Sequence, residues 1–171
     1  MLHSRSRLQL TLLVAVSLLI GLWLGAAVAK KKTVQRPSLT KEAMSTFLNG
    51  KRNAIMATLK KDGSPQLTPV WYRWDGEQFW VSITKDRAKY KNLRRDTRIS
   101  LCIDDAETFT TVIASGKARL TEENLWPDTQ KISERYRGPE EGPAYVKRMQ
   151  ENKEPRVLVV LKPEKIISWG R

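Results

Sequence analysis

The sequence predicts a small, mainly β barrel with a few short helices (α+β), preceded by one transmembrane helix. Two patterns carry this prediction. After residue 50, most of the chain alternates apolar and polar residues with the period of two that is typical of strands, and turn residues separate the runs. Before that, residues 8–29 are uncharged and mostly apolar. The chain has 171 residues, which leaves room for one domain of ordinary size.

Residues 8–29 form the predicted transmembrane helix. As a helix, these 22 residues reach about 33 Å, which is enough to cross the hydrocarbon core of a bilayer. A cleaved signal peptide is the alternative, because Arg5 and Arg7 precede the segment and Ala27-Val28-Ala29 resembles a cleavage site. Lys30-Lys31-Lys32 follow at once, and such a cationic run hinders export and prefers the cytoplasmic face. We therefore expect an uncleaved anchor.

This interpretation divides the chain into three parts. Residues 1–29 are the anchor or signal segment, residues 30–37 are a basic linker, and residues 38–171 are the barrel domain. The protein is then expected to be anchored in the membrane with its domain in the cytoplasm. Export after cleavage of the signal is the alternative location.

The barrel domain begins with a short helix, for which Thr40 is a suitable N-cap and Gly50 a stop. Strand patterns follow this helix, and Asp75-Gly76 predicts a hairpin turn between the second and the third of them. Residues 156–162 form a continuous apolar run, which is typical of a strand buried on both faces. The strands are expected at residues 54–60, 66–74, 78–84, 99–104, 110–121 and 156–162, with a short one at 165–169.

Helices are expected between these strands at residues 87–96, with Asp86 as the N-cap, at 125–137 and at 144–152. Five or six strands with short turns and few helices are typical of a small barrel. Glu140 and Glu141 stand between two Gly-Pro pairs and predict an exposed loop, with a lid over a binding site as the alternative.

Two residue types are scarce enough to exclude several kinds of enzyme. The single histidine, His3, precedes the apolar segment, and the single cysteine is Cys102. A Ser-His-Asp triad, a Cys-His nucleophile pair and a zinc site of His and Cys ligands therefore cannot form within one domain. If the protein is an enzyme, a bound cofactor is expected to carry the chemistry. No metal site is predicted.

The positive charge of the chain is unevenly distributed. The formal net charge is +13, but residues 1–37 contain six Lys or Arg and no acidic residue. The rest of the chain has 25 basic against 18 acidic residues, a net charge of +7. This moderate excess favours an anionic ligand and does not require nucleic acid.

The most informative segment runs from Lys85 to Arg98. A predicted strand ends there in hydroxyl residues and passes into the start of a basic helix. A helix N-terminus offers free N–H groups and the positive end of the helix dipole, which suit phosphate. Arg87 and Lys89 would add charge at that point. A solvated basic helix and a contact with nucleic acid are the alternatives.

Several short motifs follow one another along the domain: Ala57-Thr58-Leu59, Asp62-Gly63, Pro65, Pro69-Val70-Trp71, Arg87-Ala88-Lys89, Asn92-Leu93-Arg94-Arg95-Asp96 and Arg98. Their order and spacing resemble those of the pyridoxamine-phosphate-oxidase-like split β-barrel proteins. The resemblance is greatest to the branch that depends on the deazaflavin coenzyme F420, with FMN-binding members as close relatives. It extends from about residue 39 to residue 169.

The resemblance implies a split β-barrel that forms a homodimer with cofactor sites at the subunit interface. It implies that Arg87 and Lys89 hold the cofactor phosphate, that Ser82 and Thr84 add hydroxyl contacts, and that residues 68–71 lie against the ring system largely through backbone groups. The cofactor-binding residues expected on this basis are Arg87, Lys89, Asn92, Ser82, Thr84, Thr68, Pro69, Val70 and Trp71. The partners expected are a second copy of the chain, a small-molecule substrate and the membrane, but no nucleic acid.

The function implied is that of an F420-dependent oxidoreductase, which transfers a hydride between the reduced deazaflavin and an unsaturated organic substrate. An FMN-binding oxidoreductase of the same fold is the first alternative, and a non-catalytic flavin- or tetrapyrrole-binding protein is the second. No catalytic residue stands out. Tyr72, Tyr90 and Lys60 are the candidate proton donors, and each has a structural role as its alternative.

Overall fold

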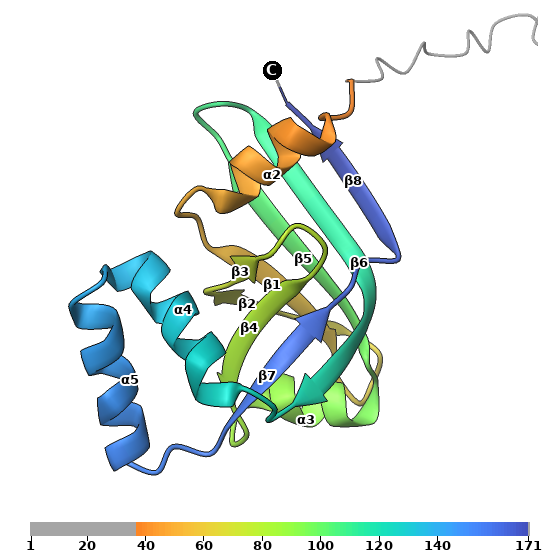
Figure 1. Ribbon diagram of the computed structural model, residues 1–171. Coiled ribbons are helices and arrows are strands. Elements are labelled where there is room, and N and C mark those ends of the chain that lie inside the picture. Colours follow the sequence, from red (N-terminus) through yellow and green to blue (C-terminus); the bar gives the residue numbers. More distant parts are fainter. Residues whose placement is uncertain (1–36, 171) are drawn as a thin grey trace, which may run out of the picture. The chain divides into compact units, whose positions relative to one another are not determined.

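The computed structural model describes residues 37–170, which form a curved antiparallel sheet with helices around it (Figure 1). Eight strands are described, one more than the seven strand ranges expected from the sequence. In chain order, the elements are α2 (Lys41–Asn49), β1 (Ala54–Leu59), β2 (Pro65–Val70), β3 (Arg73–Trp74), β4 (Phe79–Thr84), α3 (Ala88–Arg95), β5 (Arg98–Asp105), β6 (Thr110–Thr121), α4 (Leu125–Arg137), α5 (Glu141–Glu151), β7 (Arg156–Leu161) and β8 (Lys165–Trp169).

The strands are hydrogen-bonded in the order β2-β1-β5-β6-β7-β4-β3, and β8 pairs with β6. The long strand β6 belongs to both halves of the sheet. Residues 110–117 of β6 pair with β5, and residues 118–121 pair with β7. The sheet can therefore curl around one core, as Figure 1 shows. This arrangement is the split β-barrel that the sequence predicted.

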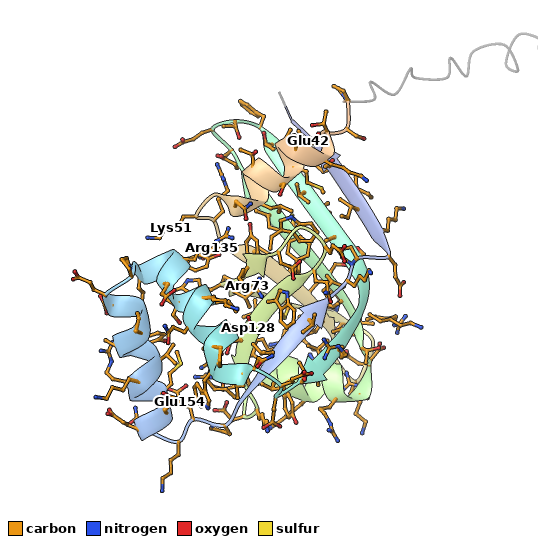
Figure 2. All side chains as sticks on the ribbon, viewed as in Figure 1. Glu42, Lys51, Arg73, Asp128, Arg135 and Glu154 are labelled. Carbon is orange, nitrogen blue, oxygen red and sulfur yellow. The ribbon has the colours of Figure 1, made fainter. Side chains whose placement is uncertain are left out.

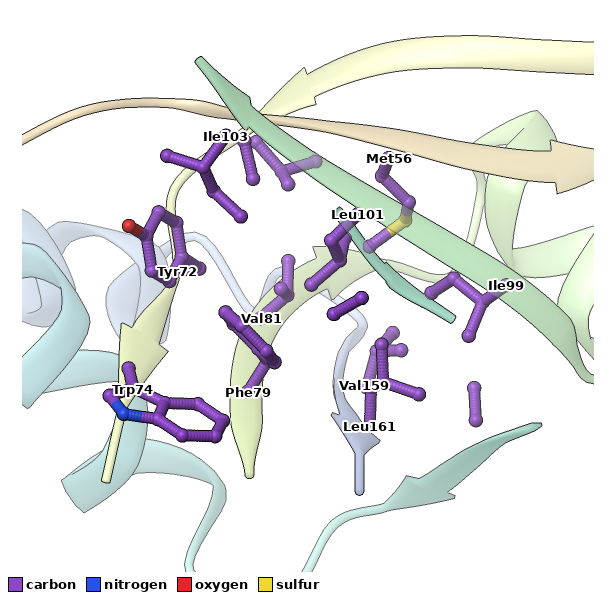
Figure 3. Close-up of a cluster of buried hydrophobic side chains, with 14 of the residues drawn as sticks. Met56, Tyr72, Trp74, Phe79, Val81, Ile99, Leu101, Ile103, Val159 and Leu161 are labelled. Carbon is purple, nitrogen blue, oxygen red and sulfur yellow. The ribbon is translucent and has the colours of Figure 1, made fainter. Parts of the chain in front are cut away.

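The core fills the inside of the curved sheet (Figure 3). Along β4, Phe79, Val81 and Ile83 are buried and alternate with half-buried residues, as the sequence pattern predicted. Five successive residues of β7, 157–161, are all buried, because the core covers one face of this strand and α4 packs against the sheet here. The predicted strand with two buried faces is therefore confirmed.

The helices lie around the sheet and bring residues to the cleft described below. In α2, the hydroxyl of Thr40 accepts a hydrogen bond from the N–H of Ala43 at 3.1 Å, so Thr40 is the N-cap as predicted. Helix α4 contacts β3, β4 and β7, and α5 packs on α4. Helix α3 lies against β1, at the far end of the barrel from α2 (Figure 1).

Three local predictions need correction. The expected strand 66–74 is divided into β2 and β3, because Tyr72 turns into the core and its hydroxyl donates to the backbone oxygen of Leu48 at 2.9 Å. The N-cap of α3 is Arg87 and not Asp86, whose carboxylate bonds the hydroxyl of Thr84 instead. The last helix begins at Glu141 rather than at residue 144.

The predicted fold class is also corrected in its membrane part. Among residues 37–170, no helix is both long and apolar enough to span a membrane. The 13-residue α4 measures about 20 Å along its axis, against about 30 Å of hydrocarbon. Residues 8–29, which carried the prediction, lie outside the described residues. The transmembrane helix and the membrane-anchored location are therefore wrong for the part of the chain that the structure describes.

The alternation along β4 leads to a test of the barrel core. Phe79 is fully buried against Tyr72 and Trp74, whereas Trp80 is half-buried on the opposite face. Phe79→Ala should lower the free energy of unfolding by about 3–5 kcal/mol, because it removes a buried ring and leaves a cavity. Trp80→Ala should cost clearly less. Urea unfolding of both variants measures the two losses of unfolding free energy. Equal losses would contradict the assignment of Phe79 to the core face of β4 and of Trp80 to the opposite face.

Candidate functional site

A cleft of about 560 Å³ opens beside the ends of β2 and β4. Its residues come from β2, β4, β7, the start of α3, α5 and neighbouring loops. They are Asn53, Pro69, Val70, Trp71, Ser82, Ile83, Thr84, Arg87, Lys89, Tyr145, Glu154 and Arg156. Figure 2 labels Glu154 in the segment that leads from α5 to β7. The cleft lies within the size range of known ligand pockets.

Seven of the nine cofactor-binding residues expected from the sequence line this cleft. They are Ser82, Thr84, Arg87, Lys89, Pro69, Val70 and Trp71. The other two, Thr68 and Asn92, do not line it. Asn92 is buried in α3, and its amide donates to the side chains of Thr58 at 3.1 Å and Gln66 at 2.8 Å. Asn92 therefore ties α3 to β1 and β2.

Cations from two elements meet on one wall of the cleft. Arg87 is the N-cap of α3 and is exposed, while Lys89 lies in the first turn and is half-buried. Arg156 begins β7, where it stands opposite Thr84 in the pairing of β7 with β4. The first turn of a helix also leaves backbone N–H groups without partners inside the helix. Phosphate and carboxylate groups bind well in such surroundings.

Arg156 was not predicted from the sequence, and it is the most firmly held of the three cations. Its side chain is only 12% exposed. The Nε atom donates to the Ser82 hydroxyl at 3.1 Å, Nη2 donates to the Ser82 carbonyl at 3.0 Å, and Nη1 donates to a Glu154 carboxylate oxygen at 2.9 Å. The hydroxyls of Ser82 and Thr129 lie 2.9 Å apart, which adds a contact from α4. Ser82 therefore positions Arg156.

The three cations repel one another, and this repulsion contributes to a lowered pKa of Lys89. The pKa of Lys89 is lowered, first because the ammonium is partly buried and then because Arg87 and Arg156 are close to it, with Asp86 acting in the opposite direction. An anion in the cleft would relieve this repulsion. The electrostatics of this wall therefore favour a negatively charged ligand group.

The wall formed by the end of β2 is aromatic and apolar. Trp71 stacks on Tyr136 of α4, with ring centroids 4.9 Å apart and planes 5° apart. It also meets the edge of Tyr145 of α5 at 6.0 Å. Pro69 and Val70 continue this wall. The cleft therefore offers one wall that suits an anionic group and one that suits flat, apolar rings.

The structure separates the three candidate proton donors from the cleft. Tyr72 is buried in the core, and this burial raises its pKa to about 12. Tyr90 packs against the core, and Lys60 is exposed on the loop after β1. None of the three lines the cleft. Among the cleft residues missed from the sequence, Tyr145 has a hydroxyl, and Asn53 and Glu154 have polar side chains.

Comparisons with known proteins agree with this fold. The chain resembles the crystal structure of a conserved hypothetical protein, Rv2991 from Mycobacterium tuberculosis, with 31% sequence identity and a TM-score of 0.69, over 82% of this chain and 90% of that one. A chain described as an F420 reductase has 22% identity and a TM-score of 0.58, over 72% of this chain and 94% of its own. A putative pyridoxamine 5'-phosphate oxidase from Listeria innocua has 16% identity and a TM-score of 0.54, over 75% and 96%.

The family comparison covers most of the chain. The sequence profile of the pyridoxamine 5'-phosphate oxidase family matches residues 40–170, which include the whole described barrel and every residue of the cleft. The chain therefore belongs to the pyridoxamine 5'-phosphate oxidase family.

Proposed function

We propose that this protein is an F420-dependent oxidoreductase that transfers a hydride between the reduced deazaflavin and an unsaturated organic substrate. The observation that carries the proposal is that a cationic wall and an aromatic wall stand together in one cleft. Membership in the family supports a flavin-type cofactor, and the likeness in fold to an F420 reductase supports the deazaflavin.

In this proposal the chain contributes binding and orientation. Arg87, Lys89 and Arg156 hold the phosphate, and the hydroxyl of Thr84 lies beside them. The backbone of residues 68–71 lies along the ring system. The bound deazaflavin supplies the hydride, while the protein orients the ring and excludes water.

FMN is the second candidate cofactor, and one observation favours it. Three cations and the carboxylate of Glu154 together give this wall a formal charge of +2. That charge matches a phosphate monoester, which carries about two negative charges near neutral pH. The substrate would still be an unsaturated organic molecule, so the two candidates differ in cofactor and not in the class of reaction.

Cofactor titration tests the proposal. The purified protein should bind F420 or FMN with a Kd in the micromolar range or tighter, and the reduced cofactor should be reoxidised by an enone or a quinone. Binding without reoxidation would indicate a non-catalytic carrier. Arg87→Ala with Lys89→Ala should weaken binding by more than about 100-fold, since each charge-assisted phosphate contact contributes roughly 1.5–3 kcal/mol.

The matched control for this double variant is Lys91→Ala with Arg94→Ala. It removes two exposed cations from the same helix, neither of which lines the cleft. This control should bind within about threefold of the unchanged protein, because exposed and screened charges contribute little. Equal weakening by both double variants would mean that the net charge of α3 attracts the cofactor and that Arg87 and Lys89 form no phosphate site.

The lowered pKa of Lys89 predicts how cofactor affinity depends on pH. Lys89 must be protonated to attract the phosphate, so affinity is full below its pKa and falls as the pH rises through it. Because this pKa is lowered, the fall should begin below the usual lysine value of about 10.4. In Lys89→Arg the side chain stays protonated and the fall should vanish. Titrations from about pH 7 to about pH 10 check this, and identical profiles for the two proteins would contradict it.

We also propose that the protein is a homodimer. Ile55, Cys102, Ile113 and Ile167 stand in register across β1, β5, β6 and β8, and Pro69 of β2 continues the row. Ile55 and Ile167 are 39% and 44% exposed, which leaves an apolar sheet face toward solvent. Pro69 also lines the cleft, so a second copy on this face would lie beside the cofactor.

Substitutions on β1 and β8 test the dimer. Ile167 belongs to the proposed interface, while its neighbour Ile166 lines a separate hollow between α2 and the β3–β4 turn. Light scattering should give a mass of twice 19.6 kDa for the unchanged chain and for Ile166→Lys. Ile55→Lys combined with Ile167→Lys should give the monomer mass. A dimer that survives this double variant would place the interface elsewhere.

A further inference from the structure

The side of the cleft nearest α5 is built from two aromatic rings. Trp71 follows β2 and Tyr145 lies in α5, and both line the cleft. Their ring centroids are 6.0 Å apart, with 60° between the ring planes. Since Trp71 also stacks on Tyr136 of α4, three rings from three elements form one continuous aromatic surface.

Arg137, the last residue of α4, fixes the position of the two rings that line the cleft. Its guanidinium carbon lies 4.1 Å from the centroid of Tyr145 and 5.4 Å from that of Trp71. The Nη1 atom is 2.7 Å from a carboxylate oxygen of Glu141. A guanidinium held by a carboxylate and by two rings has few other positions. Tyr145 is therefore oriented before a ligand enters.

The packing of α5 does not require Tyr145 to line the cleft. This helix rests on α4 through buried Gly142, Val146 and Met149. A Cβ atom at Gly142 would lie 2.6 Å from the Cα atom of Glu134, so the two helices are in direct contact there. The contact between α5 and α4 is therefore made by residues other than Tyr145, and it does not by itself place the Tyr145 ring in the cleft. Its position indicates a role toward a ligand.

We propose that Trp71 and Tyr145 form a substrate subsite for a flat, conjugated carbonyl compound of the quinone type. The inference rests on the proposed function, in which the backbone of residues 68–71 lies along the cofactor ring and the Trp71 side chain remains available to the substrate. Two rings at an angle accept a flat molecule by stacking on one and meeting the edge of the other. Asn53 also lines the cleft and carries an amide that donates to a carbonyl oxygen.

The test measures binding without turnover. The full chain, first with oxidised cofactor bound and then without cofactor, is titrated by calorimetry with 2,3-dimethyl-1,4-naphthoquinone, which is flat and uncharged. Cyclohexane-1,4-dione, a saturated dicarbonyl, is the comparison compound. Tyr145→Ala should weaken quinone binding between about three- and tenfold, and Tyr145→Phe should stay within about twofold. Lys147→Ala, an exposed change on the same helix, is the control and should have no effect.

The affinities of Tyr145→Ala for the quinone, the saturated compound and the cofactor decide whether the subsite exists. Weaker quinone binding in Tyr145→Ala, with unchanged cofactor affinity and unchanged binding of the saturated compound, supports the subsite. Absent quinone binding, equal affinity in Tyr145→Ala, or an equal loss of cofactor affinity overturns it. If Tyr145→Ala lowers the Tm, then Tyr145→Leu, which keeps a large apolar side chain and removes the ring, replaces it and should also weaken quinone binding. Failure of the proposed function would show separately, as an absence of cofactor binding or of turnover.

Discussion

The cleft depends on one strand, β6, which is shared by both halves of the barrel. Its first eight residues pair with β5 and its last four pair with β7. On its other edge β7 pairs with β4, so that Arg156 stands opposite Thr84. The cationic wall is thus assembled by strand pairing between residues that are far apart in the sequence. Without the continuity of β6, the end of β2 and the pair β4–β7 would belong to separate sheets, and the two walls of the cleft would not meet.

Burying a cation in this wall costs free energy of solvation, and the hydrogen bonds of the wall offset that cost. A guanidinium that is largely removed from water needs partners for its donors. Arg156 has them in Ser82 and Glu154. The protein therefore orders this cation during folding, when the sheet forms. An anionic ligand then meets a side chain that is already in position, and little conformational entropy is lost on binding.

The sequence predicted most of the strands and the split barrel, because apolar alternation depends on local chemistry and the family motifs follow in a specific order. The bounds of β6, α4 and β8 agree with the sequence interpretation to the residue. The division between β2 and β3 could not be predicted, because it depends on the distant carbonyl that accepts from Tyr72. Seven expected cofactor residues gather in one cleft, whereas Asn92 serves the packing of α3. Arg156 was missed because no local pattern reveals that β4 and β7 pair.

The buried amide of Asn92 couples the motion of α3 to that of the barrel. It bonds the side chains of Thr58 in β1 and Gln66 in β2, so α3 cannot leave the barrel without breaking both contacts. Arg87 and Lys89 at the start of α3 are therefore coupled to β1 and to β2, whose end contributes Pro69 and Val70 to the cleft. A ligand held at one end of α3 stabilises the helix and these strands as one cooperative unit. Their backbone amides should then gain protection from hydrogen exchange together.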